Sequence, residues 1–209
     1  MDFKLSEEQN LLIKSTKSFV KNELMQHEEL LEKTDNLPKE LYQKIKKKSQ
    51  ELGLYACNMP TEYGGGGLNA FDLTLIEKEL GHTSLALAEI AWRPQNILMA
   101  CTGKLIDEYL KPATTGERKD CIAMTEPEAG SDLRGMKTNA VQSGDDWTIN
   151  GTKHFISNAH ISDFVVLFAS TGKDEKGRNL LSCFLVDLDL PGVEVVKGYD
   201  CVSHRGYVN

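Results

Sequence analysis

The chain has 209 residues, of which 40% are hydrophobic and 26% are charged, and this composition excludes a predominantly disordered protein. Its net charge of −7 disfavours nucleic acid or an anionic membrane surface as the main partner, because both require excess Lys and Arg. The longest apolar runs are far shorter than the ~20 residues that span a bilayer. The length predicts one large domain or two small ones.

The cysteines and histidines show no spacing typical of a structural framework. Five scattered cysteines without a C-x-x-C pair argue against a disulfide scaffold or a structural zinc site. The five histidines show no H-E-x-x-H or similar spacing, so we expect no metal. The first residues resemble neither a signal peptide nor a transit sequence, and we expect a cytoplasmic protein.

The first half of the chain has the periodicity of amphipathic helices. Ser6 and Gln9 form a capping box at the start of a first helix. A second helix is predicted to begin near Pro38 and to end at Gly53. Its buried side is expected to carry Leu41, Ile45 and Leu52.

Four consecutive glycines at residues 64–67 invite comparison with nucleotide-binding loops. A P-loop needs Lys and Ser or Thr after its last glycine, and Leu68 follows here. A dinucleotide fingerprint is also poorly matched, because Asn69 stands where a third spaced glycine belongs. We therefore predict a flexible turn before a helix that is capped by Asn69 or Asp72 and ends at Gly81.

Two further helical segments are predicted before the character of the sequence changes. One begins near Ser84 and should kink or end at Pro94, because proline removes a helical hydrogen bond. The other covers residues 104–110 and is expected to close at Pro112.

From about Cys121 onward, β-branched and aromatic residues alternate with polar ones. The candidate strands are residues 147–149, 164–168, 181–186 and 193–196. The candidate turns are Gly144, Asn150-Gly151, Gly172, Gly177 and Pro191-Gly192. Short strands joined by turns favour an antiparallel barrel or sandwich. The expected fold is therefore multi-domain: an all-α domain at residues 1–118, followed by an antiparallel β-barrel domain at residues 119–209.

The end of the chain, residues 202–209, reads as a loop that enters another strand with nothing to close it. We therefore expect the β domain to be truncated at its C-terminal end.

Residues 124–132 form the segment with the clearest functional character. Thr125 and Ser131 offer hydroxyl groups, Pro127 fixes the entry of the loop, and Gly130 permits a ligand to approach the backbone. Such a loop suits a polar heterocycle or a pyrophosphate, although an ordinary Pro-Gly turn has the same composition.

The same nonapeptide resembles the signature of the acyl-CoA dehydrogenase family, flavoenzymes that oxidise acyl-CoA thioesters. Residues 150–158 are similar to the second flavin-side segment of that family. Residues 5–9, 63–65 and 187–195 also resemble family features, in the family's order. The resemblance therefore covers nearly the whole chain.

The resemblance implies FAD as cofactor. The implied cofactor-binding residues are Ile122, Ala123, Met124, Thr125, Gly130, Ser131, Phe155, Ile156 and Ser157. In the family, Thr125 matches a threonine that hydrogen-bonds the pyrimidine side of the flavin. Ser157 matches a hydroxyl at flavin N5, and Ser131 matches a serine near the pyrophosphate and the acyl-CoA substrate. Glu128 stands where many members have Gly, and we expect it to point to solvent because burying its charge is costly.

The resemblance also implies α,β-dehydrogenation of an acyl-CoA thioester, with hydride transfer to flavin N5, in fatty acid metabolism. An electron-transfer flavoprotein is the implied acceptor and a homo-oligomer the implied assembly. In the family the glutamate base belongs to a C-terminal helical domain, which we expect this chain to lack, so the chain alone is expected to be inactive. Glu79 and Glu89 are interpreted as surface charges and Glu126 as part of the flavin-side loop, and no catalytic residue is assigned.

Two other readings stay open from the sequence. The chain could be a non-catalytic binding or assembly module derived from the same fold. A nicotinamide-binding domain built on the four glycines is a weaker alternative, because it requires strands and helices that alternate in a parallel sheet.

Overall fold

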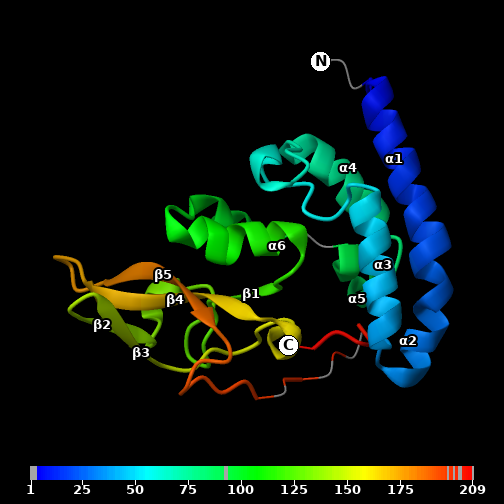
Figure 1. Cartoon of the computed structure of the whole chain (residues 1–209). Helices are drawn as coiled ribbons and strands as arrows, with labels where there is room; N and C mark the ends of the chain where they lie inside the picture. Colours follow the sequence, from blue (N-terminus) through cyan, green and yellow to red (C-terminus); the bar gives the residue numbers. More distant parts are fainter. Residues whose placement is uncertain (1–3, 92–93, 197, 200, 202–203, 209) are drawn as a thin grey trace. The chain divides into compact units, whose positions relative to one another are not determined.

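A computed structural model describes residues 4–91, 94–196, 198, 199, 201 and 204–208. The chain divides into two compact units (Figure 1). The helical unit runs to Glu117 and includes a returning segment at residues 204–207. The β unit runs from Arg118 to Tyr199 and includes Val208.

The helical unit contains α-helices joined by short 3-10 and π-helical turns. Its α-helices are α1 (Glu7–Phe19), α2 (Glu28–Thr34), α3 (Lys39–Glu51), α4 (Ala70–Leu80), α5 (Leu85–Ala88) and α6 (Lys111–Thr115). The turns are η1 (Val20–Leu24), η2 (Met25–His27), η3 (Thr61–Tyr63), η4 (Glu89–Ala91), η5 (Asn96–Ala100) and η6 (Ile106–Leu110).

The predicted start of the first helix is confirmed. The Ser6 hydroxyl accepts a hydrogen bond from the Gln9 N–H at 3.1 Å, and the Gln9 side chain accepts from the Ser6 N–H at 3.0 Å. This capping box satisfies two N–H groups that the first helical turn leaves without intrahelical partners. The capping box therefore sets the first residue of α1.

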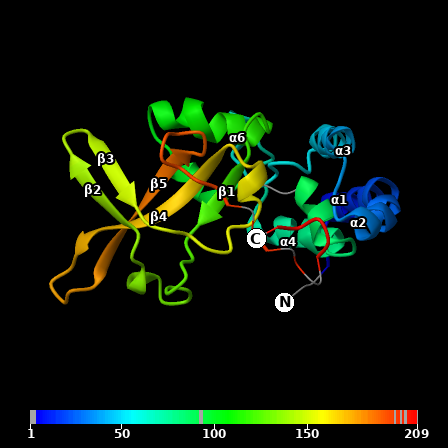
Figure 2. The same cartoon turned by 90° about the horizontal axis from the view of Figure 1, so that it is seen from below.

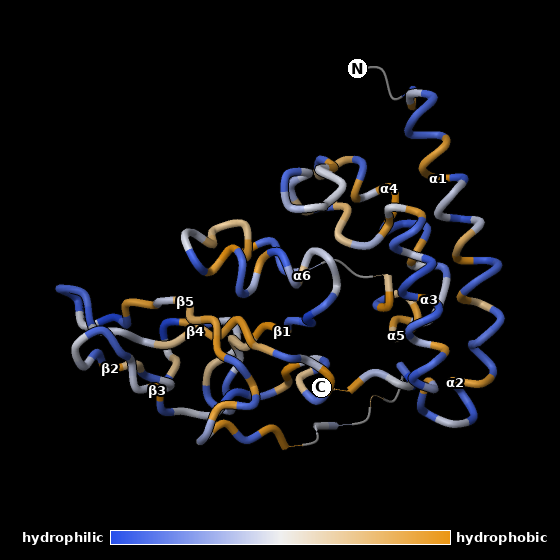
Figure 3. Tube along the Cα trace, viewed as in Figure 1, coloured by the Kyte–Doolittle hydropathy of each residue, from blue (hydrophilic) through white to orange (hydrophobic). Residues whose placement is uncertain are grey.

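Apolar residues at helical spacing form the core of this unit, and Figure 3 shows hydrophobic residues recurring along α1 between hydrophilic ones. The fully buried members include Phe19, Val20, Leu24, Leu31, Ile45, Leu54, Ile76, Leu87 and Ile90. Leu41 packs against this core, as predicted. The prediction for Leu52 is wrong: it is the C-cap residue of α3, beyond the core contacts, and is 40% exposed.

The glycine-rich segment at residues 64–67 is a tightly bonded turn, so the prediction of a flexible turn is wrong. The N–H groups of Gly65, Gly66 and Gly67 donate to the carbonyls of Pro60, Ala56 and Met59 at 3.0, 3.1 and 2.8 Å. A Cβ on Gly65 would overlap the Met59 carbonyl, and one on Gly66 would lie 2.8 Å from the Cys57 Cα. The backbone donors that a phosphate would need are therefore already used.

The helix after this turn begins as predicted. The Asn69 side chain accepts from the N–H groups of Phe71 and Asp72 at 2.9 and 3.1 Å, and α4 ends at its C-cap, Gly81. Glu79, interpreted from the sequence as a surface charge, is only 7% exposed. That interpretation is wrong because Glu79 follows the buried Ile76 by three residues and so lies on the same buried face of α4.

The predicted helix near Ser84 is confirmed as α5, which continues into η4. Residues 92 and 93, just before Pro94, lie outside the described residues. The prediction that the next segment closes at Pro112 is wrong, because Pro112 lies in the first turn of α6. Pro112 is the second residue of α6, and the π-helical turn η6 leads directly into α6, so the helical backbone continues past the proline.

The β unit is a mixed sheet centred on β4 (Phe164–Lys173). The other strands are β1 (Asp120–Ala123), β2 (Asn139–Ser143), β3 (Asp146–Asn150) and β5 (Asn179–Asp187). β5 pairs with β4 antiparallel, whereas β1 pairs with β4 parallel. β2 joins β4 in parallel at one residue pair and carries β3 as a hairpin at that end of the sheet (Figure 2).

This topology corrects the expected antiparallel barrel. The long connection over residues 124–163 lets β4 run in the same direction as β1, which a short hairpin turn cannot do. Among the described residues the sheet order is β1-β4-β2-β3 with β5 on β4, and it does not close on itself.

Three predictions in the β unit are wrong in detail. Gly144 forms the hairpin turn between β2 and β3, as predicted, but no hairpin turn forms at Asn150-Gly151, because β3 runs through Asn150 into a loop. Gly172 lies within β4 at an irregularity of register. Residues 193–196 form no strand, and the strand expected at residues 202–209 lies partly outside the described residues.

Candidate functional site

The first flavin-side segment leaves β1 and makes a tight turn at residues 126–129. The Glu126 N–H donates to the Ala129 carbonyl at 2.8 Å, and the Ala129 N–H donates back at 3.3 Å. Pro127 occupies the second position of this turn, where its fixed φ is favoured. The turn directs Glu128 to solvent, as expected, and its exposed carboxylate pairs with Lys137.

The second flavin-side segment lies against the first. The His154 N–H donates to the Thr125 carbonyl at 2.8 Å. The Lys153 ammonium donates to the Met124 carbonyl at 3.1 Å and to Glu126 Oε1 at 2.9 Å. The structure thus brings together two segments whose contacting residues are 29 and 27 positions apart in the sequence.

Glu126 and Lys153 form a buried ion pair. Their side chains are 4% and 8% exposed, and the carboxylate also accepts from the N–H groups of Lys137 and Thr138 at 2.6 and 3.0 Å. Burial alone would raise the pKa of Glu126. The Lys153 ammonium and the two N–H groups outweigh burial and lower this pKa to about 2. In the sequence, the only signal of this pair is that each member lies in one of the two family-like segments.

Phe155 has an unusual backbone and an exposed ring. Its φ is 57°, a left-handed conformation that is rare for a bulky residue, and it is 55% exposed. Its ring stacks on His154 with centroids 3.9 Å apart and lies 5.5 Å from the Tyr199 ring. The Tyr199 hydroxyl lies 3.2 Å from His154 Nε2. These contacts leave an aromatic face available to a ligand.

Two of the predicted site residues pack inside the β unit. Ala123 is 2% exposed in a cluster with Cys121 and Val165, and Ile156 from the second segment packs against this cluster. The Ala123 side chain therefore offers no exposed surface to a ligand. Ile122, the intervening residue of β1, is partly exposed.

Thr125, Gly130 and Ser131 leave polar groups and space available. No described residue hydrogen-bonds the hydroxyl of Thr125 or Ser131, and a Cβ on Gly130 would meet nothing within 4 Å. Met124 and Ser157 are partly exposed. Unused hydroxyls, an open glycine and an exposed aromatic ring suit a ligand with a flat ring system and polar edges, and FAD fits this description.

The far side of the first loop is held by β5. Buried Asn179 donates to the carbonyls of Arg134 and Met136 at 2.7 and 2.8 Å. Asp132 accepts from the Arg134 N–H at 3.2 Å. The loop is thus fixed at both ends to the sheet.

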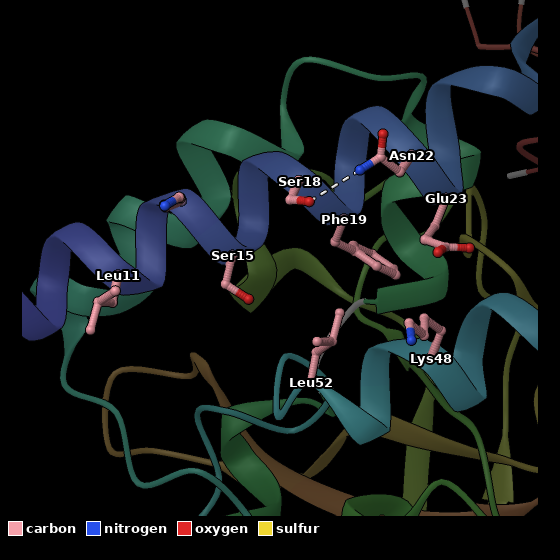
Figure 4. A pocket seen from close by; sticks show the side chains of 9 residues that line it. Leu11, Ser15, Ser18, Phe19, Asn22, Glu23, Lys48 and Leu52 are labelled. Carbon is pink, nitrogen blue, oxygen red and sulfur yellow. Dashed lines mark hydrogen bonds between the residues drawn. The ribbon is translucent and has the colours of Figure 1, made fainter.

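A separate groove of about 400 Å³ lies in the helical unit. Figure 4 shows Leu11 and Phe19 of α1 on one side of it, and Lys48 of α3 and the C-cap residue Leu52 on the other. None of the residues that line it is a predicted site residue. It explains the exposure of Leu52 and contributes nothing to the site in the β unit.

Within the described ranges, no helix is both long and apolar enough to cross a bilayer. The same part of the chain contains no group of three or more His, Cys, Asp or Glu residues that could hold a metal ion.

The structure consists of a helical domain followed by a mixed sheet that carries two apposed loops. This arrangement agrees with the acyl-CoA dehydrogenase-type flavoproteins that the sequence motifs resemble. Residues 6–117 match the acyl-CoA dehydrogenase N-terminal domain, and residues 121–208 match the middle domain. The chain therefore belongs to the acyl-CoA dehydrogenase family.

Individual relatives agree with this assignment. The probable acyl-CoA dehydrogenase YngJ of Bacillus subtilis (strain 168) is 33% identical over 99% of this chain and 54% of its own length. The caffeyl-CoA reductase-Etf complex subunit CarC of Acetobacterium woodii is 33% identical over 92% of this chain and 51% of its own. The chain spans about half the length of these curated relatives.

Solved structures give the same result. A glutaryl-CoA dehydrogenase from Mycobacterium smegmatis, in complex with FADH2, has a TM-score of 0.84 and 26% identity over 98% of this chain and 51% of its own. The N-terminal helical and middle β domains of the expected fold are thereby confirmed.

Proposed function

We propose that the chain forms the FAD-side part of an oxidoreductase that carries out α,β-dehydrogenation of an acyl-CoA thioester. The observation that supports this most strongly is the junction of residues 124–131 with residues 153–158, through the Lys153 and His154 contacts. Family membership and the FADH2-containing relative support FAD as the cofactor.

The residues proposed to hold FAD are Ile122, Ala123, Met124, Thr125, Gly130, Ser131, Phe155, Ile156 and Ser157. When bound, FAD supplies the acceptor for the hydride that leaves the substrate. The Phe155 ring offers a flat apolar face, and the hydroxyls of Thr125 and Ser157 offer hydrogen bonds to the polar edges of a flavin. Ser131, exposed at the end of the first loop, is proposed to serve both the cofactor and the substrate.

The reaction also needs a base for the α-proton and donors that polarise the thioester carbonyl. We assign the role of the base to no carboxylate of the described residues. Glu126 is unsuited to be the base, because its buried carboxylate is already held by Lys153 and two backbone N–H groups. The proposal therefore places the cofactor in this part of the protein and leaves the base to a residue outside the described set.

The names of the relatives also bear on the direction of the reaction and on the redox partner. CarC is named as a reductase subunit in a complex with Etf, so relatives of similar identity include a reductase as well as dehydrogenases. We propose an electron-transfer flavoprotein as the redox partner and a homo-oligomer as the assembly.

The test uses the full-length gene product. It should bind FAD, and the bound flavin should bleach when an acyl-CoA is added without oxygen. Bound FAD that no acyl-CoA reduces would contradict the proposed dehydrogenase and favour a non-catalytic module. Ser157→Ala should slow flavin reduction more than it lowers stability; equal reduction at normal FAD content would remove the proposed role of this hydroxyl.

A further inference from the structure

We propose that the Glu126–Lys153 ion pair is a positioning device that fixes the two FAD-side loops against each other before the cofactor binds. The inference rests on the proposed function for its ligand. Its structural part, the coupling of the two loops, can be measured without FAD.

The Lys153 ammonium contacts the first loop at three places. It donates to the Met124 carbonyl, where the loop leaves β1, and to Glu126 in the tight turn. It also lies 3.8 Å from the Met136 sulfur, near the return of the loop to the sheet. One side chain from the second loop therefore ties together the start, the turn and the end of the first.

Glu126 receives the charge and extends the connection. Its two carboxylate oxygens accept from Lys153 and from the N–H groups of Lys137 and Thr138. Glu126 accepts three hydrogen bonds and Lys153 donates a further one to the Met124 carbonyl, so the geometry compensates for burying the two charges. Loss of either partner leaves a buried charge that the loops can satisfy only by moving.

The pair lies next to the residues proposed to contact the flavin. Thr125 stands between the two residues that Lys153 binds, and its carbonyl accepts from the His154 N–H. Phe155, with its left-handed backbone, follows two residues after Lys153. A displacement of Lys153 is therefore transmitted to the Thr125 hydroxyl and to the Phe155 ring.

A second ion pair, between Glu128 of the first loop and Lys137 shortly after it, provides a matched control. Lys137 and Glu128 have the same residue types, but their side chains are 71% and 67% exposed. Exposed pairs are screened by solvent and contribute little. Lys137→Met removes a lysine from an ion pair of this loop without leaving a buried charge.

The experiment compares Lys153→Met with Lys137→Met in the full-length protein. FAD dissociation constants are measured by titration well below each melting temperature, and amide hydrogen exchange is measured without FAD. Lys153→Met should weaken FAD binding by about tenfold or more, because it leaves the Glu126 charge buried without its partner and displaces the loops proposed to contact the cofactor. Residues 124–131 and 153–158 should lose protection together. Lys137→Met should leave both measurements unchanged.

Glu126→Gln provides the second variant, since it keeps the shape of the side chain and an acceptor for the backbone donors. It should weaken FAD binding and change the visible circular dichroism of bound flavin. A protein that carries both Lys153→Met and Glu126→Gln should bind FAD as tightly as the weaker-binding single variant, because the two residues act as one unit. The result that overturns the proposal is a folded Lys153→Met or Glu126→Gln protein with FAD affinity within twofold of wild type (roughly the scatter of independent effects) and protected loops. If the wild type bound no FAD, the proposed function would fail, and hydrogen exchange would still decide whether the pair couples the loops.

Discussion

Two loops of this chain are rich in glycine and small residues. They differ in how many of their polar groups, and how much space beside their glycines, the protein itself already uses. In the glycine turn at residues 64–67, backbone N–H groups are bonded to nearby carbonyls, and added Cβ atoms at Gly65 and Gly66 would strike backbone. In the FAD-side loop at residues 124–132, a Cβ on Gly130 meets nothing, and two hydroxyls have no described protein partner.

The comparison shows that glycine content alone does not indicate a binding loop. A turn whose donors and space are consumed internally serves packing, here by delivering the chain to α4. A loop that retains free space and polar groups, while its backbone is fixed from outside, can receive a ligand. Four substitutions test this distinction, from the largest expected effect on stability to the smallest.

The largest effect is expected for Gly65→Ala. The new Cβ would overlap the Met59 carbonyl, and backbone cannot move away as a flexible side chain can. We expect a loss of more than about 3 kcal/mol in the free energy of unfolding, measured by urea denaturation. A loss below about 1 kcal/mol, in the range of ordinary substitutions, would show that the turn is not tightly packed.

Glu126→Gln should produce a loss of similar or slightly smaller size that depends on pH. The pKa of Glu126 is lowered from 4.5 to about 2 in the folded protein, so the unfolded state binds more protons between these values. Its stabilisation is therefore present above about pH 4.5 and is lost as the pH falls towards 2. This difference in pKa between the unfolded and folded states corresponds to about 3 kcal/mol in the free energy of unfolding.

The measurement is the free energy of unfolding at several pH values for wild type and variant. The wild-type curve should fall more steeply with acid than the curve of Glu126→Gln. Parallel curves would mean that the folded state does not hold this carboxylate in its charged form.

Asn69→Ala should have an intermediate effect. Its side chain accepts from two N–H groups at the start of α4, and the loss of such a cap costs about 1 kcal/mol. Thermal or chemical unfolding measures the change, and Asn69→Asp, which retains an acceptor, should restore most of it. An unchanged stability for Asn69→Ala would indicate that the glycine turn sets the start of α4 without the cap.

The smallest effect on stability is expected for Gly130→Ala. Its φ is not in the left-handed region and its Cβ position is open, so the free energy of unfolding should stay within about 0.5 kcal/mol of wild type. FAD affinity should nevertheless fall, because the methyl group occupies space proposed for the cofactor. Unchanged FAD affinity would place the cofactor elsewhere along the loop.

Local signals in the sequence predicted much of the helical unit. The Ser6 capping box and the Asn69 cap act through neighbours two or three residues away, and both are confirmed. The prediction for Pro112 is wrong because the helical backbone passes it directly after the π-helical turn η6, and that turn has no local signal in the sequence.

Non-local pairing limited the predictions for the β unit. The predicted turn at Gly144 is confirmed by the pairing of Ser143 with Asp146, whereas Asn150-Gly151, which is typical of a hairpin turn, forms none. The parallel pairing of β1 with β4 depends on a long connection whose path has no local signature. The family resemblance indicated which segments form the candidate site, but the Glu126–Lys153 pair spans 27 residues and required the folded structure.

The left-handed backbone of Phe155 has a consequence for protein engineering. A non-glycine residue in such a conformation costs about 1–3 kcal/mol, and glycine or asparagine would relieve part of it. Directed evolution that selects for heat resistance alone should therefore favour replacement of Phe155 and loss of its aromatic face. Libraries intended to retain flavin chemistry should hold this codon constant, since here stability and activity are expected to select different residues.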